Sequence, residues 1–329
     1  MIRSNCKTKP FDQAAAHLPA FLQDVLSHVP DDIREVTREI RIRAGGALTL
    51  TAAKTLFFTS AGRVTELFQP DCLQSNAAQV RETLQSLCNY SLHSYTDDIN
   101  RGFLTLPGGH RAGVCGTAVR KDDQVCAVRD VSSINLRIAR DVPNASRALC
   151  DTVFRCGALP NVLIAGAPGS GKTTLLRDIA CRLSAGTYGA HRRVAIVDER
   201  GELAGVRDGM PCRYVGATTD VLTGYTKREG ILLAMRSLSP EVILCDELGP
   251  QADADALEAC MYAGISFVAT VHANSLYETQ KRPITKRLLA LGAFDWLVQL
   301  QGANAPCTIA ELKKHEKYND PETECLTWV

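Results

Sequence analysis

The stretch Gly166-Ala-Pro-Gly-Ser-Gly-Lys172-Thr173 decides the fold of this chain. It fits the pattern GxxxxGK[ST], in which a glycine-rich loop wraps its backbone N–H groups around the phosphates of a nucleotide. An apolar run of strand type, residues 161–165, precedes the loop, and apolar side chains recur at helical spacing over residues 173–183. A strand, a glycine-rich turn and a helix in this order predict a phosphate-binding loop, because the helix N-terminus favours anions.

The loop contains the residues that we expect to bind a nucleotide and its metal ion. We expect Lys172 to reach the β and γ phosphates and the Thr173 hydroxyl to bind Mg²⁺. The sequence contains no base-specificity motif of the GTPase kind, which favours ATP as the cofactor together with Mg²⁺. The predicted nucleotide-binding residues are Gly166, Ala167, Pro168, Gly169, Ser170, Gly171, Lys172, Thr173 and Thr174.

A second apolar strand ends in two acids, in the stretch Val242-Ile-Leu-Cys-Asp246-Glu247. Parallel strands present their carboxyl ends at one edge of a sheet, so this strand delivers both acids beside the phosphates. We expect Asp246 to hold Mg²⁺ and Glu247 to orient and polarise the attacking water. The alternative, a buried strand that ends in two solvated acids, is disfavoured by the phosphate-binding loop upstream.

Two further strands end in polar residues at the same predicted edge. The first is Ala195-Ile-Val-Asp198-Glu199-Arg200-Gly201-Glu202, which is either part of the site or an ordinary charged loop. The second is Phe267-Val-Ala-Thr-Val-His272. A lone histidine at a strand end is usually structural, but the position of His272 favours a role in sensing the γ-phosphate.

Strands and helices alternate from residue 160 onward. This rhythm predicts a P-loop, RecA-like α/β fold, a mostly parallel sheet with helices on both faces. It occupies a second domain, residues 141–329, and the mixed helices and short strands of residues 1–140 predict a smaller α+β N-terminal domain. The predicted strands of the second domain are 162–165, 193–197, 242–245, 265–270 and 296–300, and its predicted helices are 173–183, 229–238, 252–262 and 284–291.

Composition bounds the class of protein. The 329 residues allow two domains. The 37 Lys and Arg residues balance the 36 Asp and Glu residues, so no nucleic-acid partner is expected. No run approaches the about 18 apolar residues of a membrane span, and the N-terminus lacks a signal peptide, so we expect a cytosolic chain. Its 13 cysteines form no CxxC pair, which favours buried thiols over metal ligands or disulfides.

The four elements, taken in order, resemble a family. The loop, the acidic stretch 197–202, the Asp246-Glu247 strand and the stretch Ala269-Thr-Val-His-Ala-Asn-Ser275 are similar to the hexameric ATPases of type II and type IV secretion and of pilus retraction. Within that superfamily the chain resembles the stage III sporulation protein AA family of endospore-forming bacteria. This resemblance covers roughly residues 35–300 and is carried by Gly108-Gly-His-Arg-Ala-Gly-Val-Cys-Gly116, Ser133-Ile-Asn-Leu-Arg-Ile-Ala-Arg140, Val197-Asp-Glu-Arg-Gly-Glu202, Thr219-Asp-Val-Leu222, Arg236-Ser-Leu-Ser-Pro240, Asp246-Glu-Leu-Gly249, Lys281-Arg-Pro283 and Phe294-Asp295.

The resemblance implies a function and a set of partners. It implies a ring-forming motor, a homo-oligomer and in particular a hexamer, which hydrolyses ATP in the mother-cell cytoplasm. There it would associate peripherally with the membrane proteins of a sporulation channel to the forespore and power the assembly or operation of that channel. The implied catalytic set is Glu247, Asp198, Glu202, His272 and Arg236.

Arginines form a separate group of candidates, because an arginine donated by a neighbouring subunit can stabilise phosphoryl transfer. The residues alone do not choose among Arg111, Arg137, Arg140, Arg200 and Arg236. The resemblance favours Arg236 and the three arginines of the first domain, since motors of this group bind nucleotide between the two domains and a neighbouring subunit.

Two other functions stay open at this point. The first is a P-loop nucleotide kinase or other phosphotransferase, although the sequence lacks an obvious arginine-rich lid and leaves His272 without a role in it. The second is a nucleotide-gated assembly scaffold with little turnover, which the presence of Glu247 disfavours.

Overall fold

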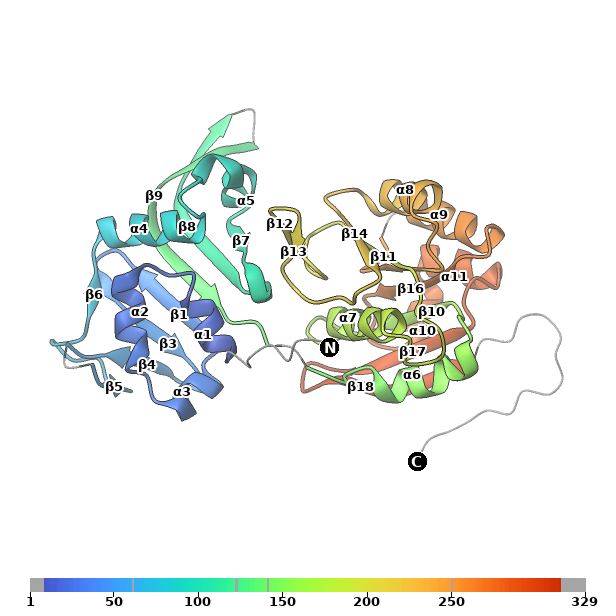
Figure 1. Ribbon diagram of the computed structural model, residues 1–329, viewed down its shortest axis with the longest axis horizontal. Helices are drawn as coiled ribbons and strands as arrows, with labels where there is room; N and C mark the ends of the chain where they lie inside the picture. Colours follow the sequence, from blue (N-terminus) through green and yellow to red (C-terminus); the bar gives the residue numbers. More distant parts are fainter. Residues whose placement is uncertain (1–8, 61, 122–123, 141, 250, 315–329) are drawn as a thin grey trace. The chain divides into compact units, whose positions relative to one another are not determined.

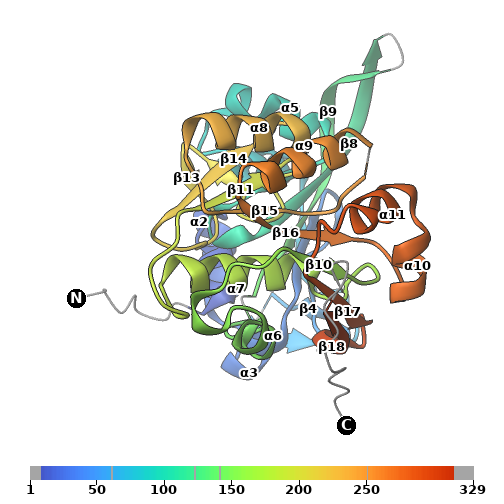
Figure 2. The same cartoon turned by 90° about the vertical axis from the view of Figure 1, so that its right-hand side faces the viewer.

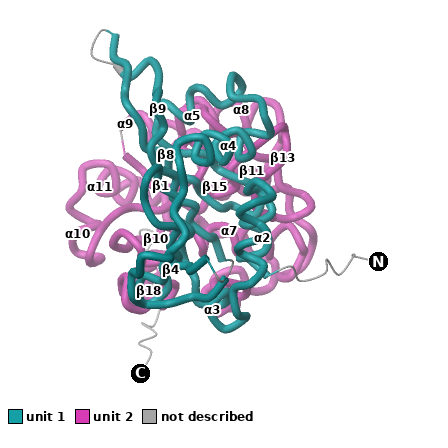
Figure 3. Tube along the Cα trace, turned by 90° about the vertical axis from the view of Figure 1, so that its left-hand side faces the viewer, with its two compact units in different colours: residues 1–140 teal, residues 141–329 magenta. Residues whose placement is uncertain are grey.

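The computed structural model describes residues 9–60, 62–121, 124–140, 142–249 and 251–314. The chain divides into two compact units, residues 1–140 and 141–329 (Figure 3). None of the helices within the described ranges is long and apolar enough to cross a membrane.

Unit 1 is an α+β unit built on an antiparallel sheet of order β5-β4-β3-β1-β9-β8-β7 (Figure 1). Leucine, isoleucine, phenylalanine and valine side chains from the helices and one face of the sheet form a single core. Its elements are α1 (Pro10–Ala15), α2 (Ala20–Ser27), α3 (Asp31–Val36), β1 (Glu39–Arg43), β2 (Gly46–Ala47), β3 (Thr49–Thr51), β4 (Thr55–Phe58), β5 (Val64–Thr65), β6 (Gln74–Ser75), α4 (Ala77–Leu87), α5 (Thr96–Asn100), β7 (Phe103–Thr105), β8 (Arg111–Lys121) and β9 (Gln124–Arg137).

Unit 2 is an α/β unit with a sheet of order β14-β11-β15-β16-β10-β17-β18. Every neighbouring pair is parallel except β17 and β18, so the predicted mostly parallel sheet is confirmed. Its main elements are α6 (Arg147–Val153), β10 (Val162–Ala165), α7 (Lys172–Ser184), β11 (Val194–Asp198), β12 (Val206–Arg207), β13 (Met210–Pro211), β14 (Thr219–Thr223), α8 (Lys227–Ser237), β15 (Val242–Cys245), α9 (Gln251–Tyr262), β16 (Ser266–Val271), α10 (Leu276–Lys281), α11 (Pro283–Ala290), β17 (Trp296–Gly302) and β18 (Ala305–Lys314).

Helices cover both faces of the sheet in unit 2, as Figure 2 shows with α8 and α9 on one side and α6 and α7 on the other. Successive strand residues point to opposite faces. In β10, Leu163 packs in the core with α8, α9 and α11, whereas Ile164 packs in the core with α6 and α7. Continuous apolar runs therefore form the central strands, because both of their faces are buried.

Two strands of this sheet are absent from the sequence prediction. Strand β14, Thr-Asp-Val-Leu-Thr at one edge of the sheet, has no fully buried residue, and β18 at the other edge is largely exposed. Such strands bury little apolar surface, so the sequence carries only a weak signal for them. In unit 1 the spacing of Val80, Leu84, Leu87 and Cys88 predicts an amphipathic helix over residues 77–92. Helix α4 ends earlier, at Leu87, because Asn89 and Tyr90 have φ of 48° and 60°, in the left-handed region.

Candidate active site

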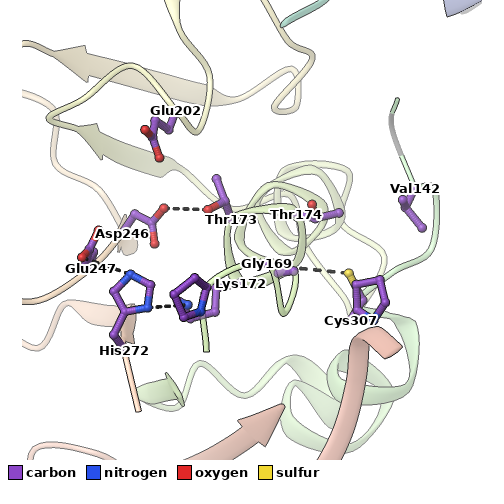
Figure 4. A pocket seen from close by; sticks show the side chains of 13 residues that line it. Val142, Gly169, Lys172, Thr173, Thr174, Glu202, Asp246, Glu247, His272 and Cys307 are labelled. Atoms are coloured by element: carbon purple, nitrogen blue, oxygen red, sulfur yellow. Dashed lines mark hydrogen bonds and ion pairs between the residues drawn. The ribbon is translucent and has the colours of Figure 1, made fainter. Parts of the chain in front are cut away.

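A pocket of about 480 Å³ lies at the carboxyl edge of the parallel sheet in unit 2. The loop that follows β10 forms one wall, and residues after β11, β15, β16 and β17 reach it from the other sides (Figure 4). All of the residues that line it belong to unit 2: Val142, Pro168, Gly169, Gly171, Lys172, Thr173, Thr174, Glu202, Asp246, Glu247, His272, Pro306 and Cys307.

Two glycines explain the shape of the phosphate-binding loop. Gly171, just before α7, has φ of 93°, and a Cβ atom there would lie 2.5 Å from the Cys307 sulfur. A Cβ atom on Gly166 would lie 2.4 Å from the Ser170 hydroxyl oxygen, which is buried beneath the loop. The left-handed backbone and the close contact make glycine necessary at Gly171. Of the nine predicted loop residues, Gly166, Ala167 and Ser170 do not line the pocket.

Lys172 is buried at the centre of the site. Its Nζ donates to the carbonyl oxygens of Gly166 at 2.7 Å and Ala167 at 3.0 Å, and it lies 3.1 Å from His272 Nδ1. Burial lowers the pKa of Lys172 below its usual value, and the nearby carboxylates of Asp246 and Glu247 oppose that shift. The site thus holds one desolvated cation against the loop, where phosphates would bind.

Thr173 and Asp246 are brought together as predicted for a metal site. The Thr173 hydroxyl donates to Asp246 Oδ2 at 2.8 Å, and both residues line the pocket. Mg²⁺ prefers oxygen ligands and is commonly bound by one or two protein groups together with substrate phosphates. This pair of oxygens beside the loop fits that ion.

Glu247 lies between His272 and Arg200. Its Oε1 is 3.1 Å from His272 Nε2, and its Oε2 accepts from Arg200 Nη1 at 3.0 Å. Lys172, His272 and Glu247 form a continuous chain of contacts in the pocket lining (Figure 4), and Arg200, outside that lining, extends it. The structure therefore places His272 between the loop lysine and the carboxylate that is predicted to polarise water.

Asp198 and Glu202, two predicted catalytic acids, lie in different environments. Glu202 lines the pocket, whereas Asp198 is 2% exposed and lies outside it, beside a small adjoining cavity. The Asp198 carboxylate accepts the backbone N–H groups of residues 202–205, four bonds of 2.8–3.0 Å. A buried carboxylate needs such donors, and these bonds fix the loop that carries Glu202. This geometry gives Asp198 a loop-holding position instead of the expected place facing the nucleotide.

The structure does not bring the candidate catalytic Arg236 to the pocket of its own chain. Arg236 is exposed in the last turn of α8 and is not among the pocket-lining residues. An exposed position on a helix end leaves it accessible to a neighbouring subunit, so a role for Arg236 in catalysis stays a prediction about an assembly.

The three arginines of unit 1 differ in how firmly they are held. Arg111 stacks on an aromatic ring at 3.6 Å, and Arg140 donates to two backbone carbonyls. Arg137 makes a looser contact, 3.6 Å from Glu39, with 65% of its side chain exposed. Among these three, Arg137 can therefore be replaced with the least damage to the fold.

Sequence reasoning missed the far end of the pocket. Val142 and Cys307 line it opposite Asp246, Glu247 and His272 (Figure 4), and Pro306, next to Cys307 in the chain, also lines it. The Cys307 N–H donates to the Ser170 carbonyl at 2.8 Å, so β18 braces the phosphate-binding loop. No sequence motif marks Pro306 and Cys307, because the pairing of β18 with β17 brings them to the loop.

Comparison with known proteins adds a family and a fold. The family model of sporulation stage III, protein AA, matches residues 12–318. Stage III sporulation protein AA of Bacillus subtilis is 34% identical over 303 residues, which are 92% of this chain and 94% of that protein. Among solved structures, the Legionella pneumophila ATPase DotB matches with a TM-score of 0.52 and 17% identity, covering 86% of this chain and 76% of DotB.

A second solved structure, the pilus retraction motor PilT with bound ADP, matches with a TM-score of 0.50 and 14% identity. It covers 82% of this chain and 75% of that protein. At these identities the two structures show a shared fold, that of P-loop secretion ATPases with an N-terminal domain. The match to the family model extends over nearly the whole chain, and the protein therefore belongs to the sporulation stage III, protein AA, family.

Proposed function

We propose that this protein is a Mg²⁺-dependent ATPase that works as a ring-forming motor of the secretion type. The observation that carries the proposal is the convergence of Lys172, Thr173, Asp246, Glu247 and His272 on one pocket beside a phosphate-binding loop. Phosphoryl transfer to water requires a cation for the phosphates, oxygen ligands for Mg²⁺ and a carboxylate that polarises the water. This pocket contains all three. The test is release of inorganic phosphate from ATP with no added acceptor, since a kinase would require one.

The pocket also supports the choice of cofactors. Thr173 and Asp246 would hold Mg²⁺, which would supply positive charge to neutralise the charge that develops on the phosphates. The fold is shared with PilT, whose structure contains ADP. The apolar end formed by Val142, Pro306 and Cys307 is available for the nucleobase.

The biological role that we propose follows from the family. The chain acts as a homo-oligomer, in particular a hexamer, on the cytoplasmic face of a membrane complex on the mother-cell side. ATP hydrolysis there powers the assembly or operation of a channel to the forespore, with membrane proteins of that channel as partners. Membership of the sporulation stage III family and the fold of secretion ATPases support this role.

ATP hydrolysis should rise more steeply than linearly with protein concentration. A site completed by a neighbour's arginine exists only in the assembled form, so activity per subunit follows the population of rings. Phosphate release is measured over a dilution series in parallel with mass by light scattering. A constant activity per subunit through the range in which rings dissociate contradicts a shared site.

Mixed rings test the donation directly. Glu247→Gln disables the site, and Arg137→Ala or Arg236→Ala disables a candidate donor. In rings formed from an equal mixture of the two variants, about a quarter of the interfaces combine an intact site with an intact donor. We expect activity to return in part for the variant that removes the true donor. A mixture of Glu247→Gln with Lys172→Ala is the matched control, because both changes disable the same site and no interface is restored.

ATP with Mg²⁺ should protect Cys307 from alkylation. The thiol lines the pocket, and burial raises its pKa, so its reaction is already slow and a bound nucleotide would slow it further. Alkylation rates by peptide mass spectrometry, with and without a non-hydrolysable ATP analogue, give the comparison. The exposed Cys115 of unit 1 is the internal control, and equal protection of both thiols would point to a general change of conformation.

A further inference from the structure

Thr270 is a fully buried polar residue that lies within the stretch Ala269–Ser275 but has no place in the proposed catalytic set. It lies in β16, between β15 and β10 in the sheet. Its neighbours Ala269 and Val271 pack on the face of the sheet that α8 and α9 cover. Since strand residues alternate, the side chain of Thr270 points to the opposite face, which α6 and α7 cover.

Three consecutive residues after β15 are hydrogen-bonded to Thr270. Its hydroxyl donates to Asp246 Oδ1 and accepts the backbone N–H of Glu247 at 2.8 Å. Its backbone carbonyl accepts the N–H of Leu248 at 2.8 Å. One residue of a central strand thus fixes both the metal-site acid and the adjacent acid.

The backbone at Glu247 shows why such a tie is needed. Glu247 has φ of 49°, in the left-handed region that a residue with a side chain rarely adopts. Such a conformation persists only where its surroundings hold it, and the hydrogen bond from Glu247 to Thr270 is one such restraint. At the same time Asp246 accepts from Thr270 through Oδ1 and from Thr173 through Oδ2, which fixes the plane of its carboxylate.

We propose that Thr270 is a positioning residue that couples the metal site to the hydrolytic carboxylate. Its hydroxyl donates a hydrogen bond to the Asp246 carboxylate and accepts one from the backbone N–H of Glu247. A single group therefore sets the orientation of the metal ligand and of the glutamate together. The proposal rests on the proposed function of the same pocket. A hydroxyl can donate and accept at once, so serine can replace Thr270, whereas valine, which has the same shape, cannot.

Variants of Thr270 separate the hydroxyl from the methyl group. Mn²⁺ binding is measured by electron paramagnetic resonance on the full chain with a non-hydrolysable ATP analogue, and turnover is measured in parallel. We expect Thr270→Val to weaken Mn²⁺ binding about 10- to 100-fold, as removal of an outer partner of a metal ligand typically does. Thr270→Ser should stay within a few-fold of the wild type in both measurements.

The control is Thr279→Val, because Thr279 in α10 is also fully buried but its hydroxyl donates to the carbonyl of Ser275, the N-cap of that helix and a partner outside the pocket lining. It should bind Mn²⁺ as the wild type does. If Thr270→Val does not fold, Thr270→Cys, whose thiol is a weak hydrogen-bonding group, takes its place in the comparison.

Three results overturn the proposal. Wild-type Mn²⁺ affinity in a folded Thr270→Val protein means that the hydroxyl does not position the site. Equal losses in Thr270→Ser and Thr270→Val mean that packing of the methyl group, and not the hydroxyl, matters. A wild-type protein that binds no metal–nucleotide complex refutes the proposed function as well, which distinguishes that failure from a failure at Thr270 alone.

Discussion

Replacing Lys172 with alanine should weaken ATP binding by on the order of 10²–10⁴-fold, because hydrogen bonds to charged groups contribute about 1.5–3 kcal/mol each and the ammonium would make two with the phosphates. The backbone amides of the loop remain, so the loss comes from the one buried side-chain cation that faces the pocket among its lining residues. Titration with a fluorescent ATP analogue measures it.

Two further variants show whether charge is responsible. Lys172→Met keeps most of the aliphatic stem and should lose as much affinity as Lys172→Ala. Lys286→Ala, at an exposed position on α11, should bind as the wild type does. Wild-type affinity in Lys172→Ala would place the nucleotide elsewhere and refute the proposed site.

Replacing Glu247 with glutamine should preserve ATP binding and lower turnover by on the order of 10²–10⁴-fold, the usual contribution of a general base. The amide keeps the shape of the side chain between His272 and Arg200 but cannot polarise water as a carboxylate does. Single-turnover hydrolysis and nucleotide titration, performed on the same preparation, separate the two effects.

Glu202→Gln tests a second candidate for the residue that polarises the attacking water. Among the acids of residues 198–202, Glu202 lines the pocket, whereas the Asp198 oxygens accept four backbone N–H groups and Glu199 pairs with the buried Lys227. If Glu247→Gln stays within a few-fold of wild-type turnover and Glu202→Gln does not, Glu202 is the better candidate for the base. If neither variant loses turnover, hydrolysis at this pocket is refuted.

Much of the fold could be predicted because its signals are local. The strands Val162–Ala165 and Val242–Cys245 are confirmed to the residue, since an apolar run buried on both faces is bounded by polar or glycine-rich turns. The phosphate-binding loop is equally local, because its turn depends on glycines adjacent in sequence. The edge strands β14 and β18 were not predicted, because they bury little apolar surface and form only by pairing with a neighbouring strand.

The site could be predicted only in part. Asp246, Glu247 and His272 meet at one edge because parallel strands share a functional end, which the strand pattern predicts. The same rule predicts that Asp198 lies at this edge. The rule gives the position of a strand end, but it does not give the hydrogen-bond partners of the side chain at that end. Four backbone N–H groups surround the Asp198 carboxylate, and they come from a loop whose path the pattern does not contain.

The sequence by itself determined that this chain has a phosphate-binding loop between a strand and a helix, with acids at the ends of later strands. Those features depend on residues close together in the chain. The tertiary structure alone decided that Thr270 holds Asp246 and Glu247, that Arg200 pairs with Glu247 and that Cys307 braces the loop. Each of these contacts joins residues more than twenty positions apart. Hydrogen bonds of this kind depend on ångström-scale distances and angles, which no spacing in the sequence encodes.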